Sequence, residues 1–298
     1  MKIGVIGAPV DLGQERRGVD MGPSVIRIAR LQERLEDLGH KVEDFGNIPA
    51  ADMSIARLGD KKARYLDDVV RECKLIAVKV AESLRQGYFP LVLGGDQSTS
   101  IGTAAGLASQ GTKRGVIWLD AHGDFNTPAT TPSGNIHGMA LAAVLGYGHP
   151  KLARLGGVFP KALEANTVLI GGRSFDPEEA KAISASKMTV FTMREIDELG
   201  MKRVIEEAIK VAGRGVDQVH VSFDVDAIDP REAPGTGTPV RGGLTYREAH
   251  LAMEMLYDWG KVTSAEFVEV NPVLDTSNHT AEVAVELILS LFGKKIIA

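Results

Sequence analysis

The sequence has very little cysteine, no excess of positive charge and no long hydrophobic run. Cys73 is the single cysteine of the 298 residues, so a scaffold built on internal disulfides is excluded. Lys and Arg number 34 against 39 Asp and Glu, a net charge of −5. This balance disfavours a dedicated nucleic-acid binder, because few cations are left to displace phosphate counterions. No stretch offers the roughly 18 apolar residues of a membrane-spanning helix. The first residues lack the apolar core of a signal peptide, so we expect a cytoplasmic protein that binds neither nucleic acid nor membrane.

What the sequence does contain is a regular alternation of short Val/Ile-rich runs with helical patterns. Hydrophobic residues make up 44% of the chain, enough to bury a large core. The expected strands are Lys2–Ile6, His40–Asp44, Phe89–Leu93, Val116–Asp120, Thr167–Ile170, Met188–Phe191, Gln218–Asp224 and Thr263–Val268. The expected helices are 23–38, 60–87, 100–109, 137–146, 177–186, 201–213, 246–258 and 279–292. The pattern predicts one α/β domain over 1–298, with three α/β/α layers and a mostly parallel eight-stranded sheet.

Two helices carry features that bear on burial. Cys73 lies on an apolar stripe of the helix expected at 60–87, which indicates a small core residue rather than a nucleophile. The helix expected at 279–292 is apolar on more than one side. Packing within the chain and burial between subunits both account for that pattern.

Polar side chains follow three of the expected strands, where each strand ends. Asp96 and Gln97 follow the first of these strands, Asp120-Ala121-His122-Gly123-Asp124 the second, and Asp224-Val225-Asp226 the third. Ligands of parallel sheets bind at the carboxyl ends of the strands. If the extended backbone persists, Asp120, His122 and Asp124 point to one side, because side chains alternate along a strand. The same holds for Asp224 and Asp226, so that four carboxylates and an imidazole converge.

Four converging carboxylates repel one another unless a countercharge is present. Oxygen-rich ligands with few imidazoles and no thiolate favour Mg²⁺ or Mn²⁺. Enough carboxylates for two ions indicates a two-metal hydrolase that activates water near neutral pH. Any one of these aspartates taken alone is equally typical of a helix cap or a turn.

Together with these segments, four further motifs resemble those of a known family. They are Arg17-Gly18-Val19-Asp20-Met21-Gly22-Pro23-Ser24, Ser133-Gly134-Asn135-Ile136-His137-Gly138-Met139, Ala233-Pro234-Gly235-Thr236-Gly237-Thr238-Pro239 and Glu269-Val270-Asn271-Pro272. Together they resemble the arginase (ureohydrolase) family over nearly the whole length. Two of the motifs, Ser-Gly-Asn-x-His-Gly and Glu-Val-Asn-Pro, resemble its bacterial arginase branch rather than the agmatinases.

The resemblance implies hydrolysis of L-arginine to L-ornithine and urea by a hydroxide held between two Mn²⁺ ions. Asp120 and Asp224 would bind both ions. One ion would also bind Asp124 and the side chain at position 97, and the other would bind His122 and Asp226. The resemblance further implies a homotrimer or a homohexamer.

The same resemblance assigns roles in catalysis and substrate binding. Asp124 would pass a proton to the leaving amine, His137 would exchange protons with bulk water, and Glu269 would pair with the guanidinium. The α-carboxylate would be held by Asn126, Ser133 and Asn135, and the α-amino group by Asp176 and Glu179, while Thr238 would line the pocket. His137 also fits the start of a helix, and Asp176 also fits a helix cap. Agmatine lacks the carboxylate that the Ser/Asn donors suit.

The sequence departs from the family pattern at Gln97. The family has Gly-Gly-Asp-His-Ser where this chain has Gly94-Gly95-Asp96-Gln97-Ser98. An amide oxygen is a weaker ligand than imidazole, so one metal site should be weakened. His220 does not replace the missing imidazole, because four strand residues put it about 13 Å from Asp224.

Three functions remain open from the sequence. The first is an arginase with unequal metal affinities, and the second is a ureohydrolase for another guanidino compound such as agmatine. The third is a metal-poor relative that binds arginine without hydrolysis.

Overall fold

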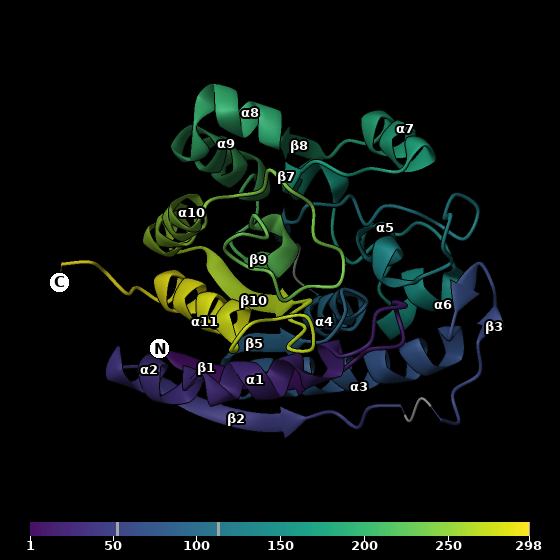
Figure 1. Cartoon of the computed structure of the whole chain (residues 1–298), viewed down its shortest axis with the longest axis horizontal. Helices are drawn as coiled ribbons and strands as arrows, with labels where there is room; N and C mark the ends of the chain where they lie inside the picture. Colours follow the sequence, from purple (N-terminus) through teal and green to yellow (C-terminus); the bar gives the residue numbers. More distant parts are fainter. Residues whose placement is uncertain (52–53, 112–113, 298) are drawn as a thin grey trace.

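The computed structural model describes residues 1–298 except 52–53, 112–113 and 298. Within these residues, eight parallel strands form a central sheet in the order β2-β1-β5-β10-β9-β6-β7-β8 (Figure 1). The strands are β1 (Lys2–Ala8), β2 (Lys41–Asn47), β5 (Phe89–Gly94), β6 (Gly115–Leu119), β7 (Thr167–Gly172), β8 (Thr189–Thr192), β9 (Val219–Asp224) and β10 (Val262–Val268). Each lies where the sequence predicts a strand, which confirms the expected α/β class with its eight-stranded sheet.

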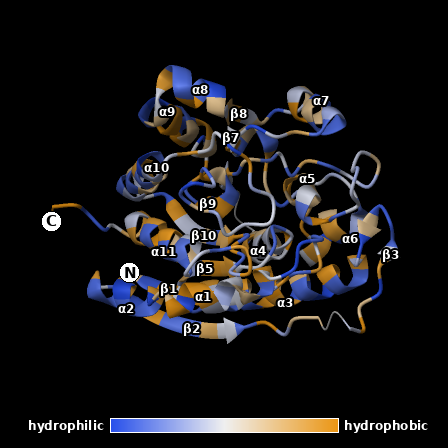
Figure 2. Ribbon diagram, viewed as in Figure 1, coloured by the Kyte–Doolittle hydropathy of each residue, from blue (hydrophilic) through white to orange (hydrophobic). Residues whose placement is uncertain are grey.

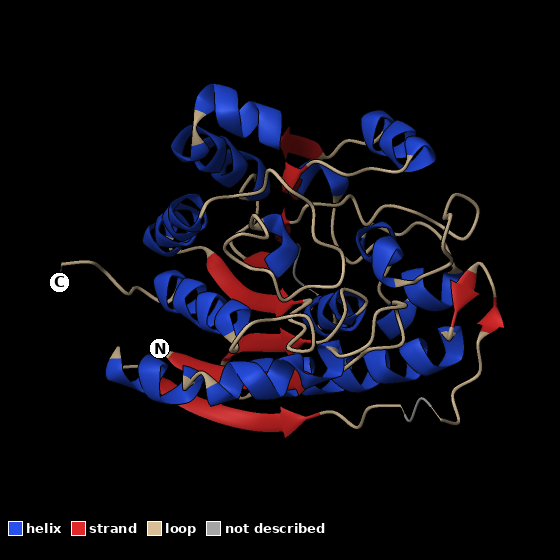
Figure 3. Cartoon of the chain, viewed as in Figure 1, coloured by secondary structure: helices blue, strands red, loops and turns tan. Residues whose placement is uncertain are grey.

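Helices cover both faces of the sheet (Figure 3). One face carries α1 (Gly22–Ile28), α2 (Leu31–Asp37), α8 (Met193–Leu199), α9 (Met201–Ala212), α10 (Tyr246–Trp259) and α11 (His279–Leu291). The other carries α3 (Leu66–Arg85), α4 (Thr99–Ala108), α5 (Ala140–Val144) and α7 (Pro177–Ala185), with the short α6 (Pro150–Ala153) beside them. Figure 2 shows hydrophobic residues gathered on the central strands and on α11, between the two helical layers. Among the described residues, no helix combines the length and the apolar character needed to cross a membrane.

Several helices differ from their predicted bounds for local reasons. The segment expected as one helix over 23–38 is divided into α1 and α2 at Arg30, which has a left-handed φ of 63°. The helix expected at 60–87 begins only at Leu66, because a small hairpin of β3 (Gly59–Asp60) and β4 (Ala63–Arg64) precedes it. The helix expected at 137–146 opens with a 3-10 turn, η2 (His137–Met139), before α5.

The predicted burial of Cys73 and its neighbours is confirmed. The Cys73 side chain is fully buried in the core beneath α3, and its Sγ donates a hydrogen bond to the Ser98 carbonyl. The apolar residues of α11 pack inside the chain, where the helix contacts α10, α1 and α2. Packing within the chain therefore accounts for that helix's hydrophobic character.

The middle of the sheet brings the chemically unusual segments together. In the strand order β5-β10-β9-β6, Val268 of β10 pairs in register with Asp224 of β9, and Phe267 pairs with Leu93 of β5. Because all four strands are parallel, the segments that follow them emerge at the same edge. Residues 95–98, 120–124, 225–227 and 269–272 therefore meet above the centre of the sheet.

Candidate metal and substrate site

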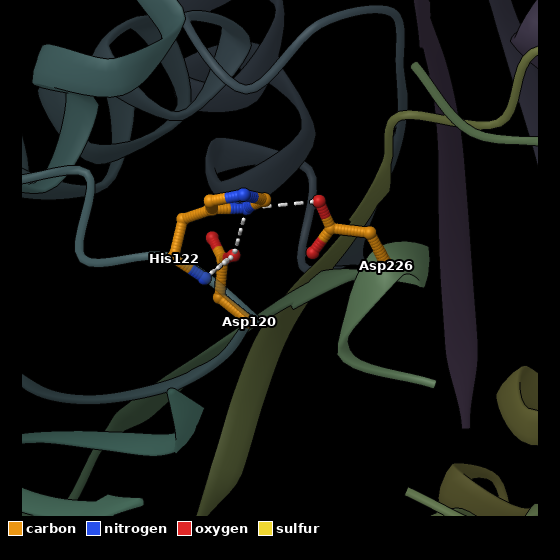
Figure 4. A group of neighbouring side chains, drawn as sticks. All are labelled: Asp120, His122 and Asp226. Carbon is orange, nitrogen blue, oxygen red and sulfur yellow. Dashed lines mark hydrogen bonds and ion pairs between the residues drawn. The ribbon is translucent and has the colours of Figure 1, made fainter. Parts of the chain in front are cut away.

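Asp120, His122 and Asp226 form a compact group at this edge, called the His122 group below (Figure 4). His122 Nδ1 lies 3.0 Å from Asp226 Oδ2 and 3.5 Å from Asp120 Oδ1. One possible ligand atom from each residue lies within 4.8 Å of the other two. These three predicted metal ligands are thus close enough to bind one ion.

Hydrogen bonds hold the two carboxylates of the His122 group in place. Asp120 accepts from Trp118 Nε1 at 3.0 Å and from the His122 backbone N–H at 2.6 Å. Asp226 accepts from the Ala121 N–H at 3.1 Å and from the Thr238 hydroxyl at 3.0 Å. The loop that carries Thr238 therefore reaches the site.

The side chains converge by a different route from the one that strand alternation predicts. β6 ends at Leu119, and Asp124 has a left-handed φ of 49°, so the extended backbone does not persist from Asp120 to Asp124. Likewise β9 ends at Asp224, and the next residues form a 3-10 turn, η5 (Val225–Ala227). The parallel order of the strands, rather than alternation along each of them, brings the carboxylates together.

Burial and mutual repulsion set the charge state of these groups. Burial acts to raise the pKa of Asp226, but the adjacent His122 outweighs it and lowers the value. For His122, burial acts to lower the pKa, but Asp226 and Asp120 outweigh it and raise the value to about 12. The His122 imidazole is therefore a cation in the absence of a bound metal ion, and it keeps Asp226 ionised.

For the remaining carboxylates, His122 does not outweigh burial and the repulsion of neighbouring carboxylates. Burial raises the pKa of Asp120 to about 6, with repulsion from Asp226 as the second cause. Burial and neighbouring carboxylates also raise the pKa values of Asp124 and Asp224 well above the ordinary range. The site thus holds more negative groups than its own cations neutralise.

Two buried oxygens near the strand ends have no hydrogen-bond partner among the described residues. They are Gln97 Oε1 and Asp124 Oδ2, and the two residues are called the Gln97 side below. The Gln97 amide nitrogen donates to Ser100 Oγ and Ser222 Oγ, while its oxygen stays unpaired. Unpaired buried oxygens, surplus carboxylates and a single imidazole form a donor set that suits hard divalent cations such as Mg²⁺ or Mn²⁺. The residues present therefore fit a metal centre.

A cavity of about 130 Å³ opens beside these groups. Its walls include three of the predicted metal ligands, His122, Asp124 and Asp224, and most of the predicted substrate-binding and catalytic residues, namely Asp124, Asn126, Ser133, His137, Asp176, Glu179 and Thr238. Gln97, Asp120, Asp226, Asn135 and Glu269 do not line it, although the Asn135 backbone N–H donates a hydrogen bond of 3.1 Å to Ser133 Oγ. Thr131 and Ser174 also line the cavity and were missed. Ser174 could have been found, because it follows the strand end of β7.

His137, which lines the cavity, forms a pair with the buried Glu269. His137 Nδ1 lies 3.1 Å from Glu269 Oε1, and His137 also begins the 3-10 turn η2, as its alternative interpretation predicts. Glu269 is fully buried and accepts further hydrogen bonds from the Gln97 backbone N–H and from Gln14. Burial acts to lower the pKa of His137, but Glu269 outweighs it and raises the value. In this structure, Glu269 contacts His137 and the backbone of Gln97 rather than the open cavity.

Asp176 and Glu179 combine two structural tasks. They form a capping box at the start of α7, in which Glu179 accepts from the Asp176 N–H at 3.1 Å. Asp176 also accepts a hydrogen bond of 2.8 Å from Asn126 Nδ2, and Glu179 accepts one of 2.8 Å from the Phe125 N–H. The helix cap thus links α7 to the segment after β6, and both carboxylates line the cavity.

Comparisons with known proteins agree with this geometry. A model of the Arginase family matches residues 1–293. The arginase of Bacillus subtilis strain 168 is 56% identical over 295 residues, and that of Bacillus caldovelox is 54% identical over 295 residues, with 99% of both chains covered in each comparison. A crystal structure of the Bacillus caldovelox arginase aligns with a TM-score of 0.96 at 54% identity over 99% of both chains. The likeness covers the strand ends and the cavity together.

Proposed function

Because the chain belongs to the arginase family, we propose that it hydrolyses L-arginine to L-ornithine and urea at a centre of two manganese ions. The observation that carries the proposal is the His122 group together with the unpaired oxygens of the Gln97 side, because His122 of the first and Asp124 of the second line one cavity. When bound, such ions lower the pKa of water, so that a hydroxide nucleophile is available near neutral pH.

The ligand set supports two unequal binding positions. Asp120 and Asp224 would be shared, His122 and Asp226 would complete one position, and Gln97 with Asp124 would complete the other. The amide of Gln97 is neutral and replaces the imidazole of the family pattern, so the second position should bind Mn²⁺ more weakly. The chain therefore needs more Mn²⁺ for full activity than a relative with histidine at this position.

The cavity walls supply groups that match each end of arginine. Ser133 and Asn126 offer donors for the α-carboxylate, and Asn135 follows on the same loop. Asp176 and Glu179 offer acceptors for the α-ammonium group. Carboxylate–ammonium and donor–carboxylate contacts are charge-assisted, so they favour an amino acid over a simple amine.

Proton transfer would use Asp124 and the His137–Glu269 pair. Asp124 lines the cavity, so its carboxyl would take up a proton there and pass it to the departing amine. His137 lines the cavity and contacts Glu269, which suits it to exchange protons between the cavity and solvent. Glu269 would then act through His137 and through the Gln97 backbone, and its contact with the guanidinium requires a rearrangement of these hydrogen bonds.

Three further features complete the proposal. Residues 1–298 act as one ureohydrolase domain, the chain assembles as a homotrimer or homohexamer, and it works in the cytoplasm. Family membership supports the first two. Sedimentation equilibrium of the purified protein tests the assembly, and a monomer at micromolar concentration would contradict it.

The decisive experiment measures urea and ornithine released from L-arginine by metal-stripped protein titrated with Mn²⁺. Agmatine and guanidinobutyrate serve as matched substrates without the α-carboxylate or the α-ammonium group. We expect urea from arginine to rise with Mn²⁺ and to exceed that from either comparison compound. A preference for agmatine would favour the other ureohydrolase reaction. No urea at any Mn²⁺ level, with folded protein that binds less than one ion per chain, would favour a non-catalytic arginine-binding protein.

A further inference from the structure

The Gln97 amide lies between two serines that contact only its nitrogen end. Gln97 is 1% exposed, and its Nε2 lies 2.6 Å from Ser100 Oγ of α4 and 3.0 Å from Ser222 Oγ of β9. Its Oε1 is buried without a partner among the described residues. A buried acceptor left unpaired costs about 1–3 kcal/mol, so this orientation needs a physical cause.

The two serines place the Gln97 amide close to Asp224. Ser222 precedes Asp224 by two residues on β9, so the two side chains lie on the same face of the strand. Ser100 lies in the first turn of α4, directly after the segment that carries Gln97. The amide therefore contacts Ser222, the neighbour of Asp224 on the same face of β9, and it lies between the sheet and α4.

A second buried pair lies beside Ser222. Glu266 pairs in register with Ser222 on the neighbouring strand β10, and His220 Nε2 lies 3.2 Å from Glu266 Oε1. Within the described chain, neither Glu266 oxygen has a hydrogen-bond partner. Ser222 therefore lies beside an acidic side chain that has no hydrogen bond of its own.

A serine hydroxyl has one proton and two lone pairs. In this arrangement both serines present lone pairs to the Gln97 amide nitrogen, and these accept an N–H but repel the amide oxygen. The reversed amide, with its oxygen toward the serines, would lose both hydrogen bonds. The two serine contacts thus favour the orientation that leaves Oε1 unpaired.

We propose that Ser100 and Ser222 are positioning residues that accept both N–H groups of Gln97 and so keep its amide oxygen free to bind the weaker metal ion. The inference rests on the proposed function, because that ion belongs to it. The two serines do not touch the ion or the substrate, and they act through Gln97 alone. They make a neutral amide usable at a position where the family has imidazole.

The test measures Mn²⁺ binding to metal-stripped protein by isothermal titration calorimetry in two backgrounds. The double substitution S100A/S222A is made in the chain with Gln97 and in the variant Gln97→Glu. The glutamate carboxylate has two oxygens and no nitrogen, so it presents an oxygen to the metal ion in either orientation. In the Gln97 background we expect the second ion to bind about tenfold more weakly, as for other groups that orient metal ligands. In the Gln97→Glu background the same substitutions should change that affinity by less than about twofold, because there is no nitrogen end to exclude. Within each background the first ion should bind equally with and without the serine substitutions.

The outcomes separate a positioning role from a general packing role. Equal losses in both backgrounds, or no loss in either, would overturn the inference. Thermal melts check the fold, and if S100A/S222A does not fold, Ser222→Ala alone is compared in the same two backgrounds. The unsubstituted protein decides the proposed function separately, through urea release. If the unsubstituted protein releases urea but binds only one ion, the inference fails and the proposed activity stands. If it binds two ions but releases no urea, the proposed activity fails and the inference stands.

Discussion

The His122 group and the Gln97 side differ in how their oxygens are satisfied. In the His122 group an imidazolium lies 3.0 Å from Asp226 and lowers its pKa. On the Gln97 side Asp124 forms no ion pair in the described chain, its pKa is raised despite the nearby His122, and both Asp124 Oδ2 and Gln97 Oε1 are unpaired. One half of the site carries its own countercharge, while the other half depends on a ligand. Binding an ion must therefore displace a proton from the first half and fill unsatisfied oxygens in the second.

The largest effect should come from removing one carboxylate from each half. Asp226→Asn and Asp124→Asn should each reduce urea formation more than about 100-fold, because groups that merely orient metal ligands already contribute up to that factor. Their effects on the metal-free fold should have opposite signs. Asp226→Asn weakens the pairing of the His122 cation and destabilises the protein by up to about 3 kcal/mol. Asp124→Asn removes a buried carboxyl with a raised pKa, so it stabilises the fold at pH values above the ordinary carboxyl pKa, where burying an ionisable carboxyl costs stability.

Chemical denaturation of both variants at pH 7.5, after metal removal, measures the contrast. The unsubstituted protein under the same conditions is the reference. Destabilisation of similar size by both substitutions would show that the two halves do not differ in charge balance.

The pH dependence of metal binding should show the proton that the His122 group holds. The folded pKa of His122 is raised to about 12, so its stabilising charge is fully present below the ordinary value of 6.5 and is lost only as pH rises through about 12. Near neutral pH an incoming ion must displace this proton. Mn²⁺ affinity should therefore rise with pH, by about tenfold per unit for each proton displaced.

In the metal-free protein, the buried carboxylates make the stability of the fold fall as pH rises. Asp120 has an ordinary pKa of 3.8 that burial raises to about 6, so the metal-free fold loses stability as pH rises through that interval. Bound Mn²⁺ should offset this loss. Calorimetric titrations between pH 6 and 8, in buffers of different ionisation enthalpy, count the protons released. An affinity that does not change with pH would contradict a protonated His122.

Replacing Gln97 by histidine should reduce the difference between the halves. Gln97→His supplies an imidazole in place of the amide, so the weaker ion should bind about tenfold more tightly, equivalent to about 1.4 kcal/mol. The other ion should be unaffected, because the His122 group does not contact Gln97 in any described hydrogen bond. Mn²⁺ titrations followed by urea formation give the half-saturating concentrations. Coincident curves for the two proteins would refute unequal binding.

The strands could be read from the sequence because each is a short apolar run with a periodicity that local residues set. The short elements could not. The helix α8 begins with a capping box of Thr192 and Glu195, a signal that lies directly after β8 and was missed. The hairpin of β3 and β4 has only two residues per strand, too few to show a period.

The residues of the site could be named from motifs, but their arrangement depends on turns. The left-handed backbone of Asp124 ends the extended alternation that the sequence predicts. Strand order, which no local pattern encodes, decides that β9 and β6 are neighbours and that Asp226 therefore meets His122. The buried serines around Gln97 carry no motif at all, so only the structure reveals them. His220 is a packed strand histidine, since it lies between Ser264 and Glu266.

The smallest effect should come from a substitution that leaves both halves unchanged. Ser133 lines the cavity, and its Oγ accepts from the Asn135 N–H at 3.1 Å. Ser133→Ala removes one donor for the α-carboxylate, so KM for L-arginine should rise about fivefold, near the value of one hydrogen bond. Turnover of agmatine, which has no carboxylate, should be unaffected, and both Mn²⁺ affinities should match those of the unsubstituted protein. Steady-state kinetics with the two substrates measure this. A fall in kcat for both substrates with weaker Mn²⁺ binding would mean that the cavity wall and the metal ligands are coupled, and the contrast between the two halves would then extend into the substrate pocket.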